Sequence, residues 1–104
     1  MNCSRNDVVL LPIPFTDLSS RKVRPAVVIG RNKADLFLVP ISSQLSNTDF
    51  SLKEWRLAGL NVICGVKAQI ATVEERLVVK VVGKLAVADT LLLDKHLKNW
   101  LQLV

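Results

Sequence analysis

Apolar residues along this chain occur in short runs separated by turn-forming residues. The runs cover residues 8–15, 25–29, 36–41, 67–73 and 77–82. Runs of this length, bounded by Gly, Pro, Asn and Ser, are typical of β-strands in a small, mostly antiparallel barrel. The second and third runs do not alternate between apolar and polar residues, which predicts strands that are covered on both faces.

The second and third runs are joined by a short polar link over residues 30–34, so we expect them to pair as a hairpin. Val27, Val28, Leu36 and Leu38 should then be buried in it. Four prolines, at positions 12, 14, 25 and 40, lie in or beside the runs. Because proline cannot donate to a strand ladder, each should mark a strand start, an edge or a bulge.

The polar stretch over residues 42–61 predicts a mobile loop, a strand fragment and one helical turn. From residue 86 the spacing of apolar residues changes to that of an amphipathic helix packed on the barrel. Asp89 and Thr90 near its start agree with capping preference. The predicted apolar face consists of Leu92, Leu93, Leu97, Trp100, Leu101 and Val104.

Composition narrows the class of protein. The 104 residues are enough for one core, so we expect a single domain over 1–104. Hydrophobic residues make up 50% of the chain, which argues against disorder and favours a homodimer that covers the surplus apolar surface. The first apolar run contains Pro12 and Pro14 and is too short to span a bilayer. We therefore expect a cytoplasmic protein with no membrane partner.

Charge favours a polyanionic partner. The net charge is +5 and the pI is near 9.6, which suits either RNA or an acidic protein segment. Cys3 and Cys64 are isolated from each other and from a histidine partner, so we expect reduced thiols, no disulfide framework and no zinc site built from cysteine.

The most informative segment is the basic loop over residues 15–25, which leads directly into an apolar run. Loop lysines and arginines are usually ordinary solvated charges. Arg24 differs, because Pro25 fixes the backbone beside it.

Six short motifs in order resemble the MazF/PemK toxin family over nearly the whole chain. They are DVVL at 7–10, PFTD at 14–17, RPAVV at 24–28, VPIS at 39–42, ATV at 71–73 and VGKL at 82–85. The resemblance implies a small SH3-like barrel of the MazF/PemK/CcdB type, mainly β with a C-terminal helix. It also implies a dimeric toxin that cuts single-stranded RNA at short sequence motifs, without metal or cofactor, and is neutralised by an acidic antitoxin.

The implied reaction is attack of a ribose 2′-hydroxyl on the adjacent phosphorus, which needs proton transfer and stabilisation of a charged phosphorane. By resemblance, Arg24 matches the catalytic arginine of the family's Arg-Pro dipeptide, and Ser42 matches a position that is usually threonine. The expected RNA contacts are Thr16, Asp17, Ser19, Ser20, Arg21, Lys22, Lys67 and Gln69.

The sequence departs from the family pattern in three places. The acid that several members carry just before the segment 69–73 is absent, since Lys67 and Ala68 precede it. Asn6 stands where glycine is usual, and the loop over 19–23 lacks the common glycine. The single histidine, His96, is expected to be a packed helix residue and not a general base.

Two other functions stay open. The missing acid fits a binding module of the same fold that has lost cleavage but still binds RNA or an antitoxin. A CcdB-like toxin, which acts by binding a protein, shares the barrel, although the Arg-Pro dipeptide argues against it. Trp100 should pack the helix onto the barrel, and Trp55 should line a groove or a dimer interface.

Overall fold

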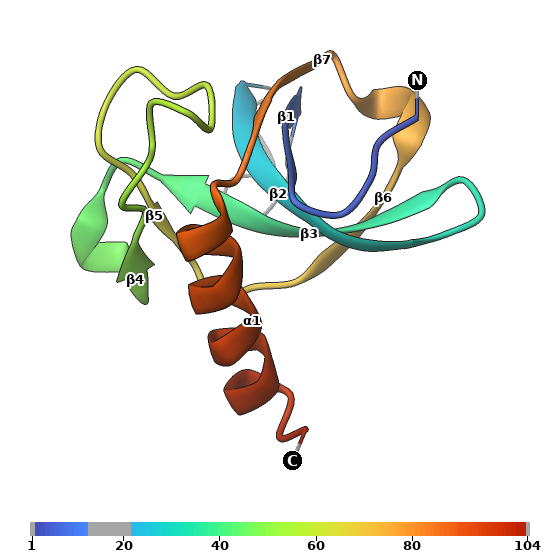
Figure 1. The fold of residues 1–104 in the computed structure, drawn as a ribbon. Coiled ribbons are helices and arrows are strands. Elements are labelled where there is room, and N and C mark those ends of the chain that lie inside the picture. The colour runs from blue at the N-terminus through green and yellow to red at the C-terminus, as the bar shows by residue number, and fades with distance from the viewer. Residues whose placement is uncertain (1, 13–21, 104) are drawn as a thin grey trace.

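The computed structural model describes residues 2–12 and 22–103. Their centre is an antiparallel meander of β1 (Asp7–Pro12), β2 (Val23–Asn32) and β3 (Asp35–Ser42) (Figure 1). The other strands are β4 (Phe50–Ser51), β5 (Gly65–Val66), β6 (Ala71–Glu74) and β7 (Lys80–Lys84). They complete a seven-stranded sheet in the order β4-β5-β3-β2-β1-β7, with β6 also paired to β3. Together with the C-terminal helix α1 (Val87–Trp100), this confirms the predicted mainly-β fold.

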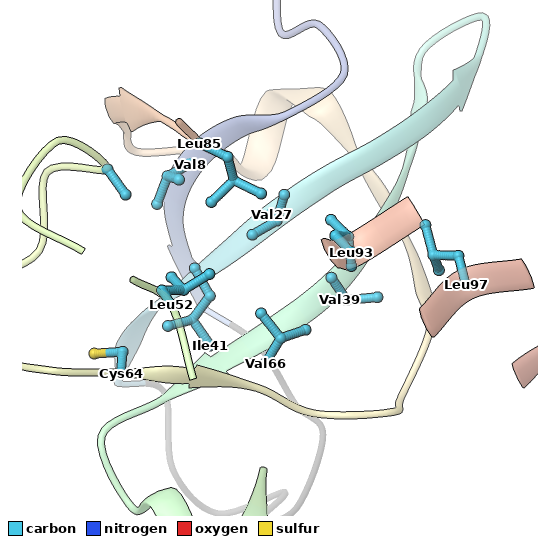
Figure 2. Close-up of a cluster of buried hydrophobic side chains, with 11 residues drawn as sticks. Val8, Val27, Val39, Ile41, Leu52, Cys64, Val66, Leu85, Leu93 and Leu97 are labelled. Atoms are coloured by element: carbon cyan, nitrogen blue, oxygen red, sulfur yellow. The ribbon is translucent and has the colours of Figure 1, made fainter. Parts of the chain in front are cut away.

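The central strands are buried on both faces, as their sequences predict. One face of the meander, which includes Val8, Val27 and Val39, packs against Leu93 and Leu97 of α1 (Figure 2). The opposite face forms a second cluster, whose buried members are Cys3, Val9, Leu11, Ala26, Val28, Leu36, Leu38 and Val78. Each face of the sheet packs against its own core, so both faces need apolar residues. The runs therefore do not alternate between apolar and polar residues.

The predicted hairpin is present between β2 and β3. Asn32 pairs with Asp35, so the turn is only Lys33 and Ala34, and Lys33 takes the positive φ of 57° that such tight turns use. Pro40 sits where β3 changes partner from β6 to β5. Its carbonyl accepts from Lys67 N at 3.0 Å on that side, so the missing N–H of Pro40 removes no bond to β2.

Two predicted strands have different boundaries in the structure. The run 67–73 is not one strand, because β5 ends at Val66 and β6 begins at Ala71. The run 77–82 begins in a 3-10 turn, η2 (Glu75–Leu77), before β7 starts at Lys80. The polar stretch holds the expected helical turn, η1 (Leu45–Asn47), and the expected strand fragment, β4.

Asp89 does not cap α1, which corrects the sequence prediction. Ala86 is the N-cap residue and supplies no side-chain bond. The Asp89 carboxylate is fully buried and accepts from the backbone N–H groups of Lys53 and Glu54, at 2.8 and 2.9 Å. It therefore ties the turn over residues 53–59 to the helix.

The apolar face of α1 is narrower than predicted. Leu93 and Leu97 are buried, and Trp100 packs against the same core as expected. Leu101 follows the last helical residue and is exposed, because the helix has ended before it. Val104 lies outside the described residues. Within the described ranges, no helix combines the length and the apolar character that crossing a bilayer requires.

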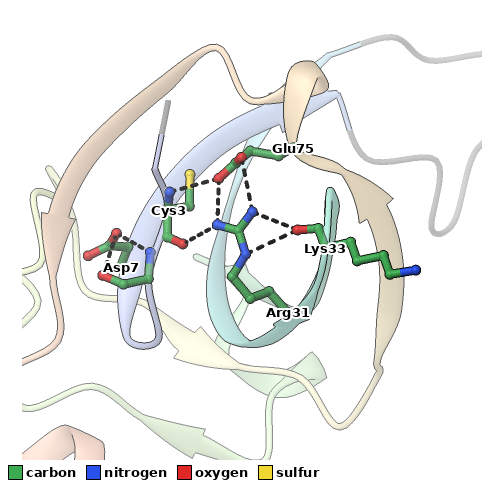
Figure 3. Close-up of polar contacts among 6 residues, drawn as sticks. Cys3, Asp7, Arg31, Lys33 and Glu75 are labelled. Atoms are coloured by element: carbon green, nitrogen blue, oxygen red, sulfur yellow. Dashed lines mark hydrogen bonds and ion pairs between the residues drawn. The ribbon is translucent and has the colours of Figure 1, made fainter.

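A polar cluster fixes the N-terminal segment to the β2–β3 hairpin (Figure 3). The Arg31 guanidinium donates to Glu75 at 2.9 Å and to the Cys3 carbonyl at 2.8 Å. Glu75 also accepts from Cys3 N at 2.8 Å. The Arg31 hydrogen bond and then the Cys3 backbone bond lower the pKa of Glu75 from 4.5 to about 2.

Replacing Asp89 with alanine should destabilise the fold strongly. The change leaves the N–H groups of Lys53 and Glu54 without their acceptor and opens a cavity under α1. We expect a loss of about 3 kcal/mol in the free energy of unfolding, measured by urea denaturation. Asp94→Ala, which removes a carboxylate of an exposed ion pair, should cost under about 1 kcal/mol. Equal losses in the two variants would contradict this account.

The contribution of Glu75 should depend on acid pH. Its folded pKa lies below its unfolded value, so the stabilisation is complete above about pH 4.5 and disappears as the pH falls toward 2. Glu75→Gln should therefore be less stable than the native chain at pH 7, with the difference closing between pH 4.5 and 2. Thermal unfolding across this range measures the difference, and a gap that is constant with pH would refute it.

Candidate functional site

The ladder between β2 and β3 ends at the pair Ala26 and Pro40. Arg24 and Ser42 lie two residues further along these strands, where β2 still pairs with β1 and β3 pairs with β5. Because the ladder has ended, the two strands separate and their side chains border a common groove.

The groove has a volume of about 890 Å³. It is lined by Leu10, Arg24, Pro25, Pro40, Ile41, Ser42, Ser43, Gln44, Asn47, Gly59, Leu60, Asn61, Val62, Cys64, Lys67, Gln69, Lys80 and Val82. Its walls combine apolar surface with amides, hydroxyls and cations, as expected of a binding site.

Four of the sequence-predicted site residues meet in this groove. Arg24 comes from β2, Ser42 from the end of β3, and Lys67 and Gln69 from the segment between β5 and β6. Lys22 is exposed just before β2 and is not among the lining residues. Thr16, Asp17, Ser19, Ser20 and Arg21 lie outside the described residues.

The groove is positively charged. Arg24, Lys67 and Lys80 line it, and no carboxylate does so among the described lining residues. Lys80 was not predicted as a site residue, because nothing in the sequence of β7 links it to Arg24. The strand register brings Lys80 close to Arg24, because Leu10 of β1 pairs with Pro25 of β2 on one side and with Lys80 of β7 on the other.

A local hydrogen bond orients the Ser42 side chain. Its hydroxyl oxygen accepts from Gln44 N at 3.1 Å. This bond restricts the rotamer, which the methyl group of a threonine would otherwise do. The hydroxyl hydrogen of Ser42 is still available to donate to a ligand in the groove.

The wall opposite the strands is formed by residues 59–64, in which no sequence motif indicates a site. Gly59 has φ +85°, and a Cβ at this position would lie 2.2 Å from the Val82 carbonyl oxygen. Only glycine allows this segment to approach β7 so closely. The turn before this wall is attached to α1, because Lys53 N and Glu54 N donate hydrogen bonds to the Asp89 carboxylate.

Cys64 lines the groove but is not a nucleophile. It is buried, and its sulfur donates to the Val62 carbonyl at 3.3 Å. Burial raises the pKa of the Cys64 thiol, which keeps it protonated. Burial and the neighbouring Glu75 raise the pKa of Cys3 as well. Both cysteines are free, as predicted.

A carboxylate from another segment lies near the position of the missing acid, and the sequence alone does not reveal it. Asp49 accepts from Ala68 N at 3.3 Å, so a carboxylate lies beside the residues that precede the segment 69–73, where the resemblance implies an acid in several family members. Asp49 is exposed and is not a lining residue. The contact joins residues 19 positions apart, and only folding brings them together.

Other candidate residues lie away from the groove. His96 stacks on Phe50 with ring centroids 4.3 Å apart and also contacts Trp100, which confirms a packed helix residue. Trp55 packs against the core beneath Arg56 and is not a lining residue.

Asn6 adopts φ 75°, the left-handed conformation that explains glycine at this position in the family. Within the described part of the chain, His, Cys, Asp and Glu form no cluster suited to a metal ion.

The fold has a clear counterpart among solved structures. An endoribonuclease in complex with its cognate antitoxin from a mycobacterial species aligns with a TM-score of 0.73 and 17% sequence identity. The alignment covers 100% of this chain and 98% of that chain, which establishes a shared fold. A comparison with curated protein sequences gives no significant match.

A family model decides the assignment. The model of PemK-like, MazF-like toxins of type II toxin-antitoxin systems matches residues 4–101, which is almost the whole chain. The seven-stranded antiparallel sheet with its single C-terminal helix agrees with this match. The chain therefore belongs to the PemK-like, MazF-like toxins of type II toxin-antitoxin systems.

Proposed function

We propose that this chain is a metal-independent endoribonuclease toxin that cleaves single-stranded RNA at selected sequences. The observation that carries the proposal is the groove itself, where Arg24, Ser42, Lys67 and Gln69 meet without a carboxylate among the described lining residues. Such a surface attracts a phosphodiester chain. Family membership and the endoribonuclease with the same fold support the same activity.

Arg24 is the proposed catalytic residue at the scissile phosphate. It is exposed in the groove and forms no ion pair with any other described residue, so its guanidinium is available for two parallel hydrogen bonds to phosphate oxygens. Ser42 donates its hydroxyl hydrogen to the same phosphate. Lys67 and Gln69 bind the RNA strand on either side of this phosphate.

The proposed step is an internal transesterification. The 2′-oxygen forms a bond to phosphorus as its proton leaves to a base, and the bond from phosphorus to the 5′-oxygen breaks as that oxygen gains a proton. The products are a 2′,3′-cyclic phosphate and a 5′-hydroxyl end. Arg24 stabilises the charge on the phosphorane and protonates the leaving oxygen.

One observation favours a second candidate, a binding module without cleavage. No carboxylate or histidine is among the described lining residues, so this part of the groove offers no ordinary general base. A module of this kind would bind RNA or an acidic antitoxin segment through the same cations. Cleavage assays distinguish the two functions.

Replacing Arg24 with alanine should abolish cleavage while the protein stays folded. We expect discrete cuts in a long single-stranded RNA that persist in EDTA, leave 5′-hydroxyl ends, and slow by at least about a hundredfold in Arg24→Ala. Ser42→Ala should slow cleavage by a smaller factor. Mapping the cut ends gives the sites and their chemistry.

The matched control is Lys95→Ala, which removes an exposed cation on α1 outside the groove. It should cleave at the native rate. Intact RNA with a folded native protein would exclude the ribonuclease and leave the binding module, and equal rates in Arg24→Ala and the native protein would remove Arg24 from catalysis.

We also propose a cytoplasmic homodimer that is neutralised by an acidic antitoxin. Exposed apolar side chains on β7 and α1, including Val81, Val87 and Leu91, support the dimer. The antitoxin bound to the endoribonuclease of the same fold, together with the family, supports the second partner.

Placing a charge on this apolar surface should separate the protomers. Light scattering should give twice the chain mass of 11.5 kDa for the native protein and the single mass for Leu91→Glu. The control Leu57→Glu places the same charge on an exposed leucine in the turn over residues 53–59, outside β7 and α1, and should stay dimeric. A native protein that is monomeric at micromolar concentration would overturn the proposed dimer.

A further inference from the structure

Two amide side chains form a pair on the rim of the groove. The Asn47 side-chain nitrogen donates to the Gln44 side-chain oxygen at 2.9 Å, and both residues are exposed lining residues. Gln44 is the N-cap residue of η1 and Asn47 is its last residue, so both lie shortly after Ser42 in the sequence. Neither residue is needed to explain how the groove attracts phosphate.

The segment that carries this pair is firmly held. Gln44 N donates to the Ser42 hydroxyl, Asn47 N donates to the Gln44 carbonyl at 3.0 Å, and the Thr48 hydroxyl donates to the Leu45 carbonyl at 2.7 Å. Asp49 N then donates to the Val66 carbonyl at 2.8 Å. The pair is thus fixed to the strand that carries Ser42.

Thr48 also anchors the segment to β5. A Cβ on Gly65 would lie 2.4 Å from the Thr48 hydroxyl oxygen, so glycine at this position lets the segment pack directly on β5. Side chains held on a rigid support lose little entropy when they bind a ligand.

The single hydrogen bond between the two side chains leaves most of their hydrogen-bonding capacity unused. Gln44 keeps both amide N–H donors, and Asn47 keeps its oxygen as an acceptor and one N–H donor. A neutral array of a donor beside an acceptor matches the edge of an unpaired base. A phosphate offers acceptors only and matches the cations better.

The geometry points to the Gln44–Asn47 pair as the element that recognises one base of the bound RNA, next to the phosphate at Arg24 and Ser42. This inference rests on the proposed function and explains how the protein selects the RNA sequences that it cleaves. Asn and Gln amides most often bind adenine, whose edge presents a donor beside an acceptor. In single-stranded RNA these edges are accessible because the base is unstacked.

The experiment is a selection for bound sequences that does not depend on cleavage. Random RNA heptamers with every 2′-hydroxyl methylated, which removes the nucleophile, are bound to the native protein and the bound fraction is sequenced. We expect one position to be enriched in adenine by about fivefold or more. Gln44→Ala and Asn47→Ala should reduce this enrichment to near unity.

Two further variants separate recognition from other roles. Gln44→Glu keeps the oxygen that accepts from Asn47, and therefore the turn, but removes both outward donors, so the enrichment should still be lost. Lys80→Ala should weaken binding of all sequences alike and leave the enrichment intact. Asn99→Ala, an exposed asparagine on α1 outside the groove, is the matched control and should behave as the native protein.

Enrichment that survives in the folded Gln44 and Asn47 variants, or a native protein with no base preference or no binding, overturns the inference. If the pair only caps η1, the variants should melt at lower temperature with their base preference unchanged. Cleavage of unmodified RNA is followed in parallel. A native protein that selects a base through this pair but leaves RNA intact would overturn the proposed cleavage and retain the inference.

Discussion

The change of partner along β3 is the constraint on which the groove depends. The first part of β3 is held between β2 and β6, and its last two residues pair with β5. Proline at position 40 cannot donate on the side where the partner changes, so the β6 ladder ends before it. Beyond that point β2 and β3 separate, and the side chains that follow, Arg24 and Ser42, face a shared space.

The second wall has no regular secondary structure and is held by a few specific contacts. The buried Asp89 carboxylate fixes the turn after Leu52, and Gly59 lets the chain pass close against β7. A long connection of this kind would otherwise be one of the least stable parts of a small domain. The stability of α1 and the shape of the groove are therefore linked through one carboxylate.

The ion pairs of the described residues lie outside the groove. Four cations outside the groove are paired with acids: Arg5 with Asp94, Arg31 with Glu75, Arg76 with Glu74 and Lys84 with Asp7. In the described part of the chain, the cations that line the groove have no such partner. Paired charges hold segments together, as Arg31 does for the N-terminal residues, whereas unpaired ones leave a field that attracts an anionic ligand.

The sequence by itself determined the hairpin of the second and third runs with its buried residues, the C-terminal helix and the family, because these depend on local periodicity and on motifs within a few residues. It also predicted Arg24 and Ser42 as site residues, and both line the groove. It missed Lys80, the Gln44–Asn47 pair and the true role of Asp89. These depend on strand register and on contacts between distant segments, and only the tertiary structure decides which side chains such contacts bring together.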